Sequence, residues 1–148
     1  VTLRDQLMRH EGFRALAYRD TAGKLTIGYG RNLSDKGISR HEAELLLDND
    51  ILEAQTAVLK SLNWTAELDR PRFEVLVNMA FNMGIQGLLG FERMLAAVEE
   101  GYWELAALEM RSSKWARQVG YRAEELAEIM RTGQDPTRSA GGDQIGST

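Results

Sequence analysis

The 148-residue sequence contains no cysteine and only two histidines, His10 and His41. Without cysteine the chain can form no disulfide, no thiolate zinc site and no thiol nucleophile. Two histidines are too few for a histidine-based metal cluster, and a serine–histidine–aspartate triad would need one of them as its base. These absences exclude thiol chemistry and leave His10 and His41 as the only candidates for a histidine base.

The sequence also lacks a long apolar run, because no stretch approaches the ~20 residues that span a bilayer. Charges interrupt the first ten residues, VTLRDQLMRH, which therefore do not resemble a signal peptide. We expect a protein made in soluble form in the cytoplasm, without a transmembrane segment. With 43% hydrophobic and 27% charged residues, the composition is typical of a single soluble domain.

Positive charge is scarce over most of the chain, and the net charge at pH 7 is −4. Residues 1–41 nevertheless hold eight lysines and arginines against four acidic residues, whereas the remaining 107 residues hold ten against eighteen. A basic segment on an acidic protein can hold an anionic polymer locally. Scattered, solvated surface charge is the alternative interpretation.

The first thirty residues combine a short helix with a strand. Thr2 and Asp5 predict a helix start, and Gly12 is placed to end that helix. A turn is predicted at DTAGK. The pattern after it is typical of a half-buried strand, since Leu25, Ile27 and Tyr29 alternate with Thr26, Gly28 and Gly30.

Helical periodicity dominates the rest of the chain. Ser39 and Glu42 predict a capping box at the start of a long amphipathic helix over 39–62. Further helical segments follow up to Gly133. The remaining residues, 134–148, are polar and rich in glycine, which predicts a flexible tail.

Glu11 is a candidate general acid. It shares the apolar stripe of the first helix with Leu7 and Met8 and lies in the last helical turn. The helix dipole and partial burial would both disfavour the ionised carboxylate there. A carboxyl that keeps its proton near neutral pH is what a general acid requires. A half-exposed glutamate in an ion pair is the alternative.

Asp20 and Thr26 occupy different surroundings. Asp20 starts a polar turn, where it should be hydrated and ionised, although aspartate in this position also caps its own turn. Thr26 is a polar residue on a strand, which its β-propensity alone would explain. Gly28 and Gly30 leave room for a ligand to approach the backbone.

The segment EGFRALAYRDTAGKLTIGYG, residues 11–30, resembles the active-site hairpin of the phage-type lysozymes, the endolysin and muramidase family. The family's glutamate, aspartate and threonine fall on Glu11, Asp20 and Thr26 with the family spacing. Other family motifs follow in order: NMAFNMG at 78–84, GF at 90–91, SKW at 113–115, YRA at 121–123 and RTG at 131–133.

The resemblance implies an α+β, mostly α-helical, two-lobed lysozyme-like fold with its active site in a cleft. A single lysozyme domain would span 1–133 and end before the tail. Its implied parts are a small hairpin lobe at about 13–38, a connecting helix at 39–62, and a helical lobe made of 63–133 plus 1–12.

The implied activity is hydrolysis of the β-1,4 bonds between N-acetylmuramic acid and N-acetylglucosamine in bacterial peptidoglycan. Glu11 would protonate the departing oxygen, while Asp20 and Thr26 would position water. No metal and no cofactor are expected, because the implied acid and base are both carboxyls. A lytic transglycosylase or a non-catalytic wall-binding relative is the alternative. The expected partner is cell-wall peptidoglycan and not nucleic acid. We expect a monomer that reaches the wall after release across the inner membrane.

Further family positions carry expected roles. Arg122 matches an arginine that pairs with the catalytic glutamate and supports catalysis. Gly30, Phe81 and Asn82 are expected to bind substrate, although core packing would also explain Phe81. Core packing is the favoured interpretation of Met83.

Three positions depart from the family. Arg31 follows GYG where the family usually has histidine, and arginine stays charged at all working pH values, so an ion pair there should lose a histidine's pH dependence. Met94 and Glu109 stand where the family places polar cleft residues. The resemblance therefore does not predict which residues of that lobe contact the sugar.

Overall fold

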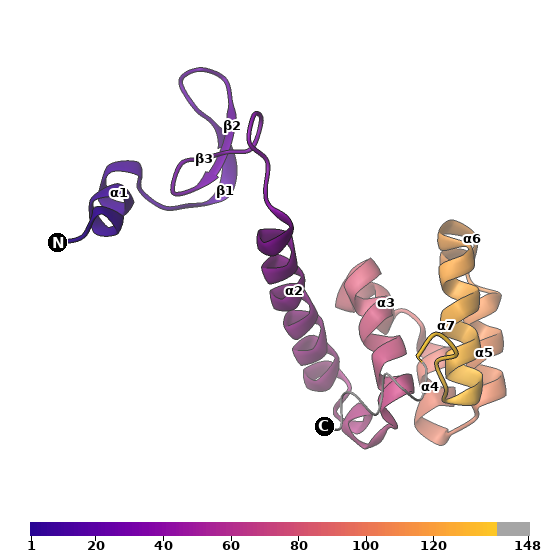
Figure 1. Cartoon of the computed structure of the whole chain (residues 1–148). Coiled ribbons are helices and arrows are strands. Elements are labelled where there is room, and N and C mark those ends of the chain that lie inside the picture. The colour runs from indigo at the N-terminus through magenta and orange to yellow at the C-terminus, as the bar shows by residue number, and fades with distance from the viewer. Residues whose placement is uncertain (139–148) are drawn as a thin grey trace. The chain divides into compact units, whose positions relative to one another are not determined.

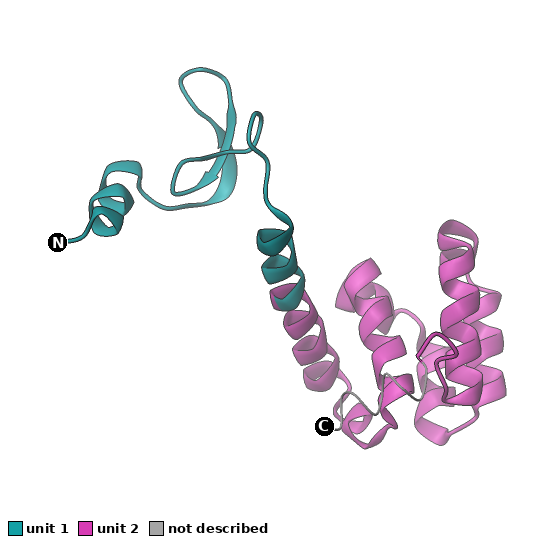
Figure 2. Cartoon of the chain, in the orientation of Figure 1, with its two compact units in different colours: residues 1–48 teal, residues 49–148 magenta. Residues whose placement is uncertain are grey.

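The computed structural model describes residues 1–138, and Figure 1 shows its elements. The chain divides into two compact units, residues 1–48 and 49–148 (Figure 2). The described residues form seven α-helices, one short 3-10 helix and a three-stranded antiparallel sheet. This confirms the predicted mostly helical α+β class. Within residues 1–138, no helix combines the length and apolar character needed to cross a membrane.

Helix α1, Leu3–Glu11, begins and ends as predicted. Thr2 Oγ1 accepts a hydrogen bond from the Asp5 backbone N–H (3.1 Å), and the Asp5 carboxylate accepts one from the Thr2 N–H (3.1 Å). Gly12 ends the helix with a φ of 70°. No residue of α1 is buried, so the expected partial burial of Glu11 is not found. Leu7, which lies on the same predicted apolar stripe, is also exposed.

The sheet of the first unit consists of β1 (Arg14–Arg19), β2 (Leu25–Gly28) and β3 (Arg31–Asn32), in that order. Thr26 lies in the central strand and pairs with residues on both sides. It is buried, at 4% exposure, whereas Tyr29 at the β2–β3 turn is exposed. The alternation predicted the opposite pattern, with Leu25 and Ile27 on the buried face, whereas the structure leaves both of them only half-buried.

Helix α2, Arg40–Ser61, runs from the first unit into the second. The predicted capping box is confirmed, because the Glu42 carboxylate accepts from Ser39 N–H (2.9 Å) and Ser39 Oγ accepts from Glu42 N–H (3.1 Å). Ala54 and Val58 are its buried residues. Only part of the predicted apolar stripe is therefore covered.

The second unit holds the main hydrophobic core. Its elements are the 3-10 helix η1 (Asn63–Glu67) and the helices α3 (Arg70–Leu89), α4 (Glu92–Glu100), α5 (Trp103–Arg111), α6 (Lys114–Val119) and α7 (Tyr121–Thr132). Helix α5 packs against α4 and α7, and α3 packs against α7. Gly84, with a φ of 81°, breaks α3 near its end. The largest fully buried side chains include Leu76, Met79, Leu88, Met94, Met110 and Met130.

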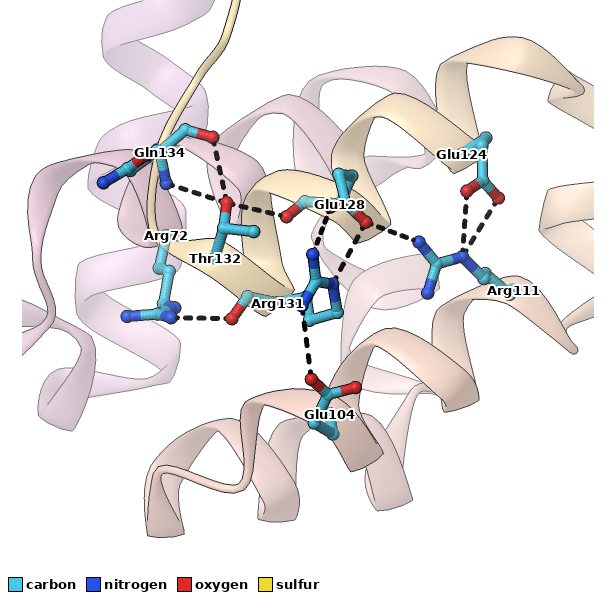
Figure 3. A network of polar contacts seen from close by, with 8 residues as sticks. All are labelled: Arg72, Glu104, Arg111, Glu124, Glu128, Arg131, Thr132 and Gln134. Carbon is cyan, nitrogen blue, oxygen red and sulfur yellow. Dashed lines mark hydrogen bonds and ion pairs between the residues drawn. The ribbon is translucent and has the colours of Figure 1, made fainter.

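A network of charged side chains joins α5 to α7 (Figure 3). Arg131 pairs with Glu128 (2.5 Å) and with Glu104 (3.4 Å), and Arg111 pairs with Glu128 and Glu124 (both 3.0 Å). The hydrogen bond from Arg131, followed by that from Arg111, holds the pKa of Glu128 below its ordinary value. These contacts stabilise the helical unit, because each arginine bridges more than one carboxylate.

Residues shortly after α7 form ion pairs that the structure describes. Arg138 forms ion pairs with Glu74 of α3 (2.7 Å) and with Asp135 (3.4 Å). The first residues of the predicted flexible tail are thus held against α3. Its remainder, 139–148, lies outside the described residues.

Candidate active site

Glu11 and Gly30 lie in contact in the first unit. Glu11 is the last residue of α1, and Gly30 lies in the turn between β2 and β3. A Cβ atom added at Gly30 would come 2.8 Å from Glu11 Oε2 and 3.1 Å from its Cδ. Only glycine lets the backbone approach this closely, and its φ of 79° also favours glycine. The structure therefore places Gly30, predicted to bind substrate, directly against the candidate acid.

Asp20 directly follows β1 and caps its own turn. Its Oδ1 accepts hydrogen bonds from the backbone N–H groups of Ala22 (2.9 Å) and Lys24 (2.8 Å). No hydrogen bond from residues 1–138 reaches its Oδ2. One carboxylate oxygen is thus fixed by the backbone, and the other is available to accept a bond from a water or a ligand.

Thr26 is linked to Asp20 through the backbone of Lys24. Thr26 Oγ1 donates a hydrogen bond to the Lys24 carbonyl oxygen (2.9 Å), while the N–H of Lys24 is bonded to Asp20. Because the hydroxyl proton is already used, Thr26 can meet a water only as an acceptor. The alternative interpretations, Asp20 as a turn cap and Thr26 as a strand residue, are thus correct for the local structure. Neither of them prevents a chemical role.

Arg122 lies in the second unit, on α7. Its Nε and Nη2 both donate to Asn78 Oδ1 on α3, at 3.0 and 2.7 Å. Among residues 1–138 no carboxylate forms an ion pair with it. A neutral amide thus orients this guanidinium and leaves its charge uncompensated. Its pairing with Glu11 stays a prediction.

Phe81 and Asn82 lie on α3 of the second unit. The Phe81 ring is 43% exposed, so it is available for contact with a ligand. Asn82 Oδ1 accepts from Trp115 Nε1 (2.9 Å), which leaves the amide N–H groups free to donate elsewhere. Met83 packs against the core, as predicted.

The two substituted positions behave differently. Met94 is 1% exposed and belongs to the core of the second unit, although it borders the groove described next. Glu109 is half-buried and lines, with Phe91, Lys114 and Trp115, a groove of about 440 Å³. Of Met94 and Glu109, both of which border this groove, only Glu109 is appreciably exposed.

The structure also reveals a partner for Arg31 that the sequence did not indicate. Arg31 Nη1 donates to Glu42 Oε1 (2.8 Å) and to the Gly37 carbonyl (3.1 Å), and Nη2 donates to Glu42 Oε2. The hydrogen bond from Arg31, followed by that from the Ser39 N–H, lowers the pKa of Glu42 to about 2. The sequence predicts Glu42 only as part of a helix capping box. That local pattern does not predict an ion pair with a residue eleven positions away.

Comparisons with known proteins identify relatives of the chain. The phage lysozyme family model matches residues 8–131. A probable T4-type lysozyme of Dictyostelium discoideum is 27% identical, over 89% of this chain and 95% of its own. The pre-baseplate central spike protein Gp5 of Enterobacteria phage T4 is 30% identical, over 90% of this chain and 28% of its own. An endolysin of Acyrthosiphon pisum secondary endosymbiont phage 1 is 29% identical, over 75% of each chain.

Proposed function

The chain belongs to the phage lysozyme family and is a glycoside hydrolase, and we propose how it acts. Its role is that of a muramidase or endolysin with bacterial peptidoglycan as substrate. The proposed target is the β-1,4 bond between N-acetylmuramic acid and N-acetylglucosamine. The protein would act on the wall after release across the inner membrane.

In this proposal Glu11 is the general acid. It protonates the glycosidic oxygen as the bond breaks, and the sugar passes through an oxocarbenium-like state. Gly30 supports this assignment, because the turn approaches the Glu11 carboxyl at a distance that only glycine allows. A side chain that is backed by a turn keeps a narrower range of positions than a free glutamate at a helix end.

Asp20 and Thr26 position the attacking water. The observation that carries this step is their shared connection to Lys24, whose N–H bonds to Asp20 and whose carbonyl accepts from Thr26. Water can donate one hydrogen to the free Asp20 Oδ2 and the other to Thr26 Oγ1, which turns its lone pair toward the sugar. Because a positioned water attacks directly, we propose that the reaction inverts the anomeric centre.

The second unit supplies charge and binding surface. Arg122 carries a guanidinium oriented by Asn78, and its proposed role, taken from the family resemblance, is to pair with Glu11. Phe81 offers an exposed ring and Asn82 offers amide donors, both suited to a sugar. These assignments rest on the family resemblance and on the bonds that leave these groups available.

Mass spectrometry of digested peptidoglycan tests the reaction class. Hydrolysis leaves reducing sugar ends, and we expect these. A lytic transglycosylase would leave anhydro-sugar ends, and a non-catalytic wall-binding protein would leave the polymer uncut. Either of these outcomes would contradict the proposal.

Glu11→Gln tests the assignment of the acid. The amide cannot donate the proton, so we expect turbidity clearing to fall by a factor of at least ~10² with the fold unchanged. Glu44→Gln is the matched control, because Glu44 is an exposed glutamate of the first unit outside the site. Near-normal activity of folded Glu11→Gln would refute the role of Glu11.

A further inference from the structure

We propose that Arg31 and Glu42 form a clamp that positions the general acid. The clamp consists of the Arg31 guanidinium, the Glu42 carboxylate and the Gly37 carbonyl oxygen. It holds the β2–β3 turn in place, and that turn in turn holds the Glu11 carboxyl. This inference rests on the proposed role of Glu11 and goes beyond it, because neither clamp residue touches the reacting atoms.

The clamp joins three segments of the first unit. Arg31 begins β3, Gly37 lies in the loop before α2, and Glu42 lies in the first turn of α2. Arg31 Nη1 donates to Glu42 Oε1 and Nη2 donates to Glu42 Oε2, and Nη1 also donates to the Gly37 carbonyl oxygen. A two-pronged arginine–carboxylate pair restricts orientation as well as distance. Strand β3 is therefore fixed relative to the start of a long helix.

Glu42 is itself held before it meets Arg31. Its Oε1 accepts from the main-chain N–H of Ser39 (2.9 Å), a bond that does not involve the Ser39 hydroxyl. The Arg31 and Glu42 side chains are 28% and 37% exposed, so water screens their pair less than it screens a fully exposed one. The clamp thus has a rigid anchor at its helix end, which a surface ion pair between two free side chains lacks.

The other end of the clamp reaches the acid through one peptide unit. Arg31 directly follows Gly30, where an added Cβ would lie 2.8 Å from Glu11 Oε2. Gly28 and Gly30 both have positive φ, and glycine restricts a turn less than any other residue. Strand β3 has only two residues, Arg31 and Asn32, so few ladder bonds define the turn. The clamp supplies the missing restraint.

The test separates positioning from stability by measuring kcat and KM on a soluble peptidoglycan oligosaccharide. Arg31→Met removes the guanidinium and keeps an apolar stem. We expect kcat to fall about tenfold with KM within about twofold, because displacing a reacting group by a fraction of an ångström slows the chemical step more than it weakens binding. Arg31→Lys should give an intermediate kcat, since lysine keeps the charge and loses the fork.

Ser39→Ala is the matched control. It removes the hydroxyl from the capping box but leaves the Ser39 N–H and the pair between Arg31 and Glu42 intact. We expect it to lower Tm and leave kcat unchanged. An unchanged kcat in Arg31→Met, an equal kcat loss in Ser39→Ala, or a loss confined to KM would each overturn the clamp.

Glu11→Gln, measured in parallel, separates the two proposals. If it is inactive while Arg31→Met is normal, the clamp fails and the role of Glu11 stands. If Glu11→Gln stays active, the proposed function fails and the clamp fails with it.

Discussion

Gly30 has no side chain, and this leaves the space that the Glu11 carboxyl occupies beside the β2–β3 turn. A methyl group there would meet the flexible end of the Glu11 side chain, not a rigid part of the fold. The clash would therefore be relieved by moving the carboxyl that we assign as the acid. The cost should appear in catalysis more than in folding.

Gly30→Ala tests this, with Gly23→Ala as its control. Both glycines have φ near +80°, so alanine should cost about 1–2 kcal/mol of backbone strain at either site. Nothing lies within 4 Å of a Cβ at Gly23, whereas Glu11 lies at 2.8 Å from a Cβ at Gly30. We expect similar urea midpoints and a kcat loss of roughly tenfold or more only in Gly30→Ala. Equal kcat values in the two variants would contradict a steric role for Gly30.

Thr26 shows how burial and function can coincide at one residue. Its hydroxyl satisfies the Lys24 carbonyl, which a buried polar group needs, and its remaining lone pair can still accept from water. The same bond that explains its burial thus fixes which way it can orient that water. A serine or threonine is suited to this arrangement, because only a hydroxyl both donates and accepts through one atom.

At the scale of elements, the pair between Arg31 and Glu42 makes stability depend on pH in a defined direction. The folded-state pKa of Glu42 is about 2, below its ordinary value of 4.5. A group with a lowered folded pKa contributes stability that is present above its unfolded pKa and is lost as pH falls through the folded value. The contribution should therefore be complete near pH 6 and fade between about pH 4.5 and 2.

Urea unfolding of wild type and Arg31→Met across pH 2–6 measures this contribution. We expect the stability difference between them to be largest near pH 6 and to shrink toward pH 2, because Glu42 then becomes protonated. Arg40→Met is the control, since Arg40 is exposed and forms no ion pair among residues 1–138. A difference that stays constant down to pH 2 would show that the ion pair is not its source.

The helix starts were predictable from the sequence, whereas the contacts between elements were not. Thr2 with Asp5, and Ser39 with Glu42, are three residues apart, so the sequence alone shows each capping box. Strand β3 is two residues long and is defined by its pairing with β2. It is therefore too short to show a periodic sequence pattern that would predict it.

In the candidate site too, the sequence predicts individual residues but not the contacts between elements. The family spacing identifies Glu11, Asp20 and Thr26 as candidates. The approach of Gly30 to Glu11 depends on how a helix and a turn meet, and the pair between Arg31 and Glu42 depends on how β3 meets α2. Such contacts follow from tertiary packing, which overrides local propensity and leaves no local pattern.

Over the whole chain, basic residues are distributed unevenly, and so are the acidic residues that form ion pairs with them. In the first unit Lys24 pairs with Asp35 (3.1 Å) and Arg31 pairs with Glu42. The other basic residues of this segment form no ion pair among residues 1–138: Arg4, Arg9, Arg14, Arg19, Lys36 and Arg40. Residues 1–41, which include Glu11 and Asp20, thus keep an excess of positive charge although the chain is acidic overall, whereas Glu42, Glu44 and Asp48 offset most of it within the unit as a whole.

This distribution predicts that the first unit holds an anionic wall by local attraction. Arg4 and Arg40 are suitable for reversal, because both lie in the first turn of a helix, where glutamate is favoured by the helix dipole. Arg4→Glu with Arg40→Glu should reduce clearing of whole walls more than cleavage of a short soluble oligosaccharide, which lacks the extended charge. The added loss should shrink at high salt, because surface charges act over a Debye length of about 8 Å at physiological ionic strength.

Lys60→Glu with Arg117→Glu is the matched control, since it changes net charge equally at exposed cations of the second unit. If long-range attraction by the whole protein governed wall binding, the two double variants would lose clearing equally. Local attraction requires the loss to be larger for Arg4 and Arg40, at low salt, and on whole walls only. Thermal melting of both variants checks that each is folded, and equal losses on the two substrates would assign the basic residues to ordinary solvated surface.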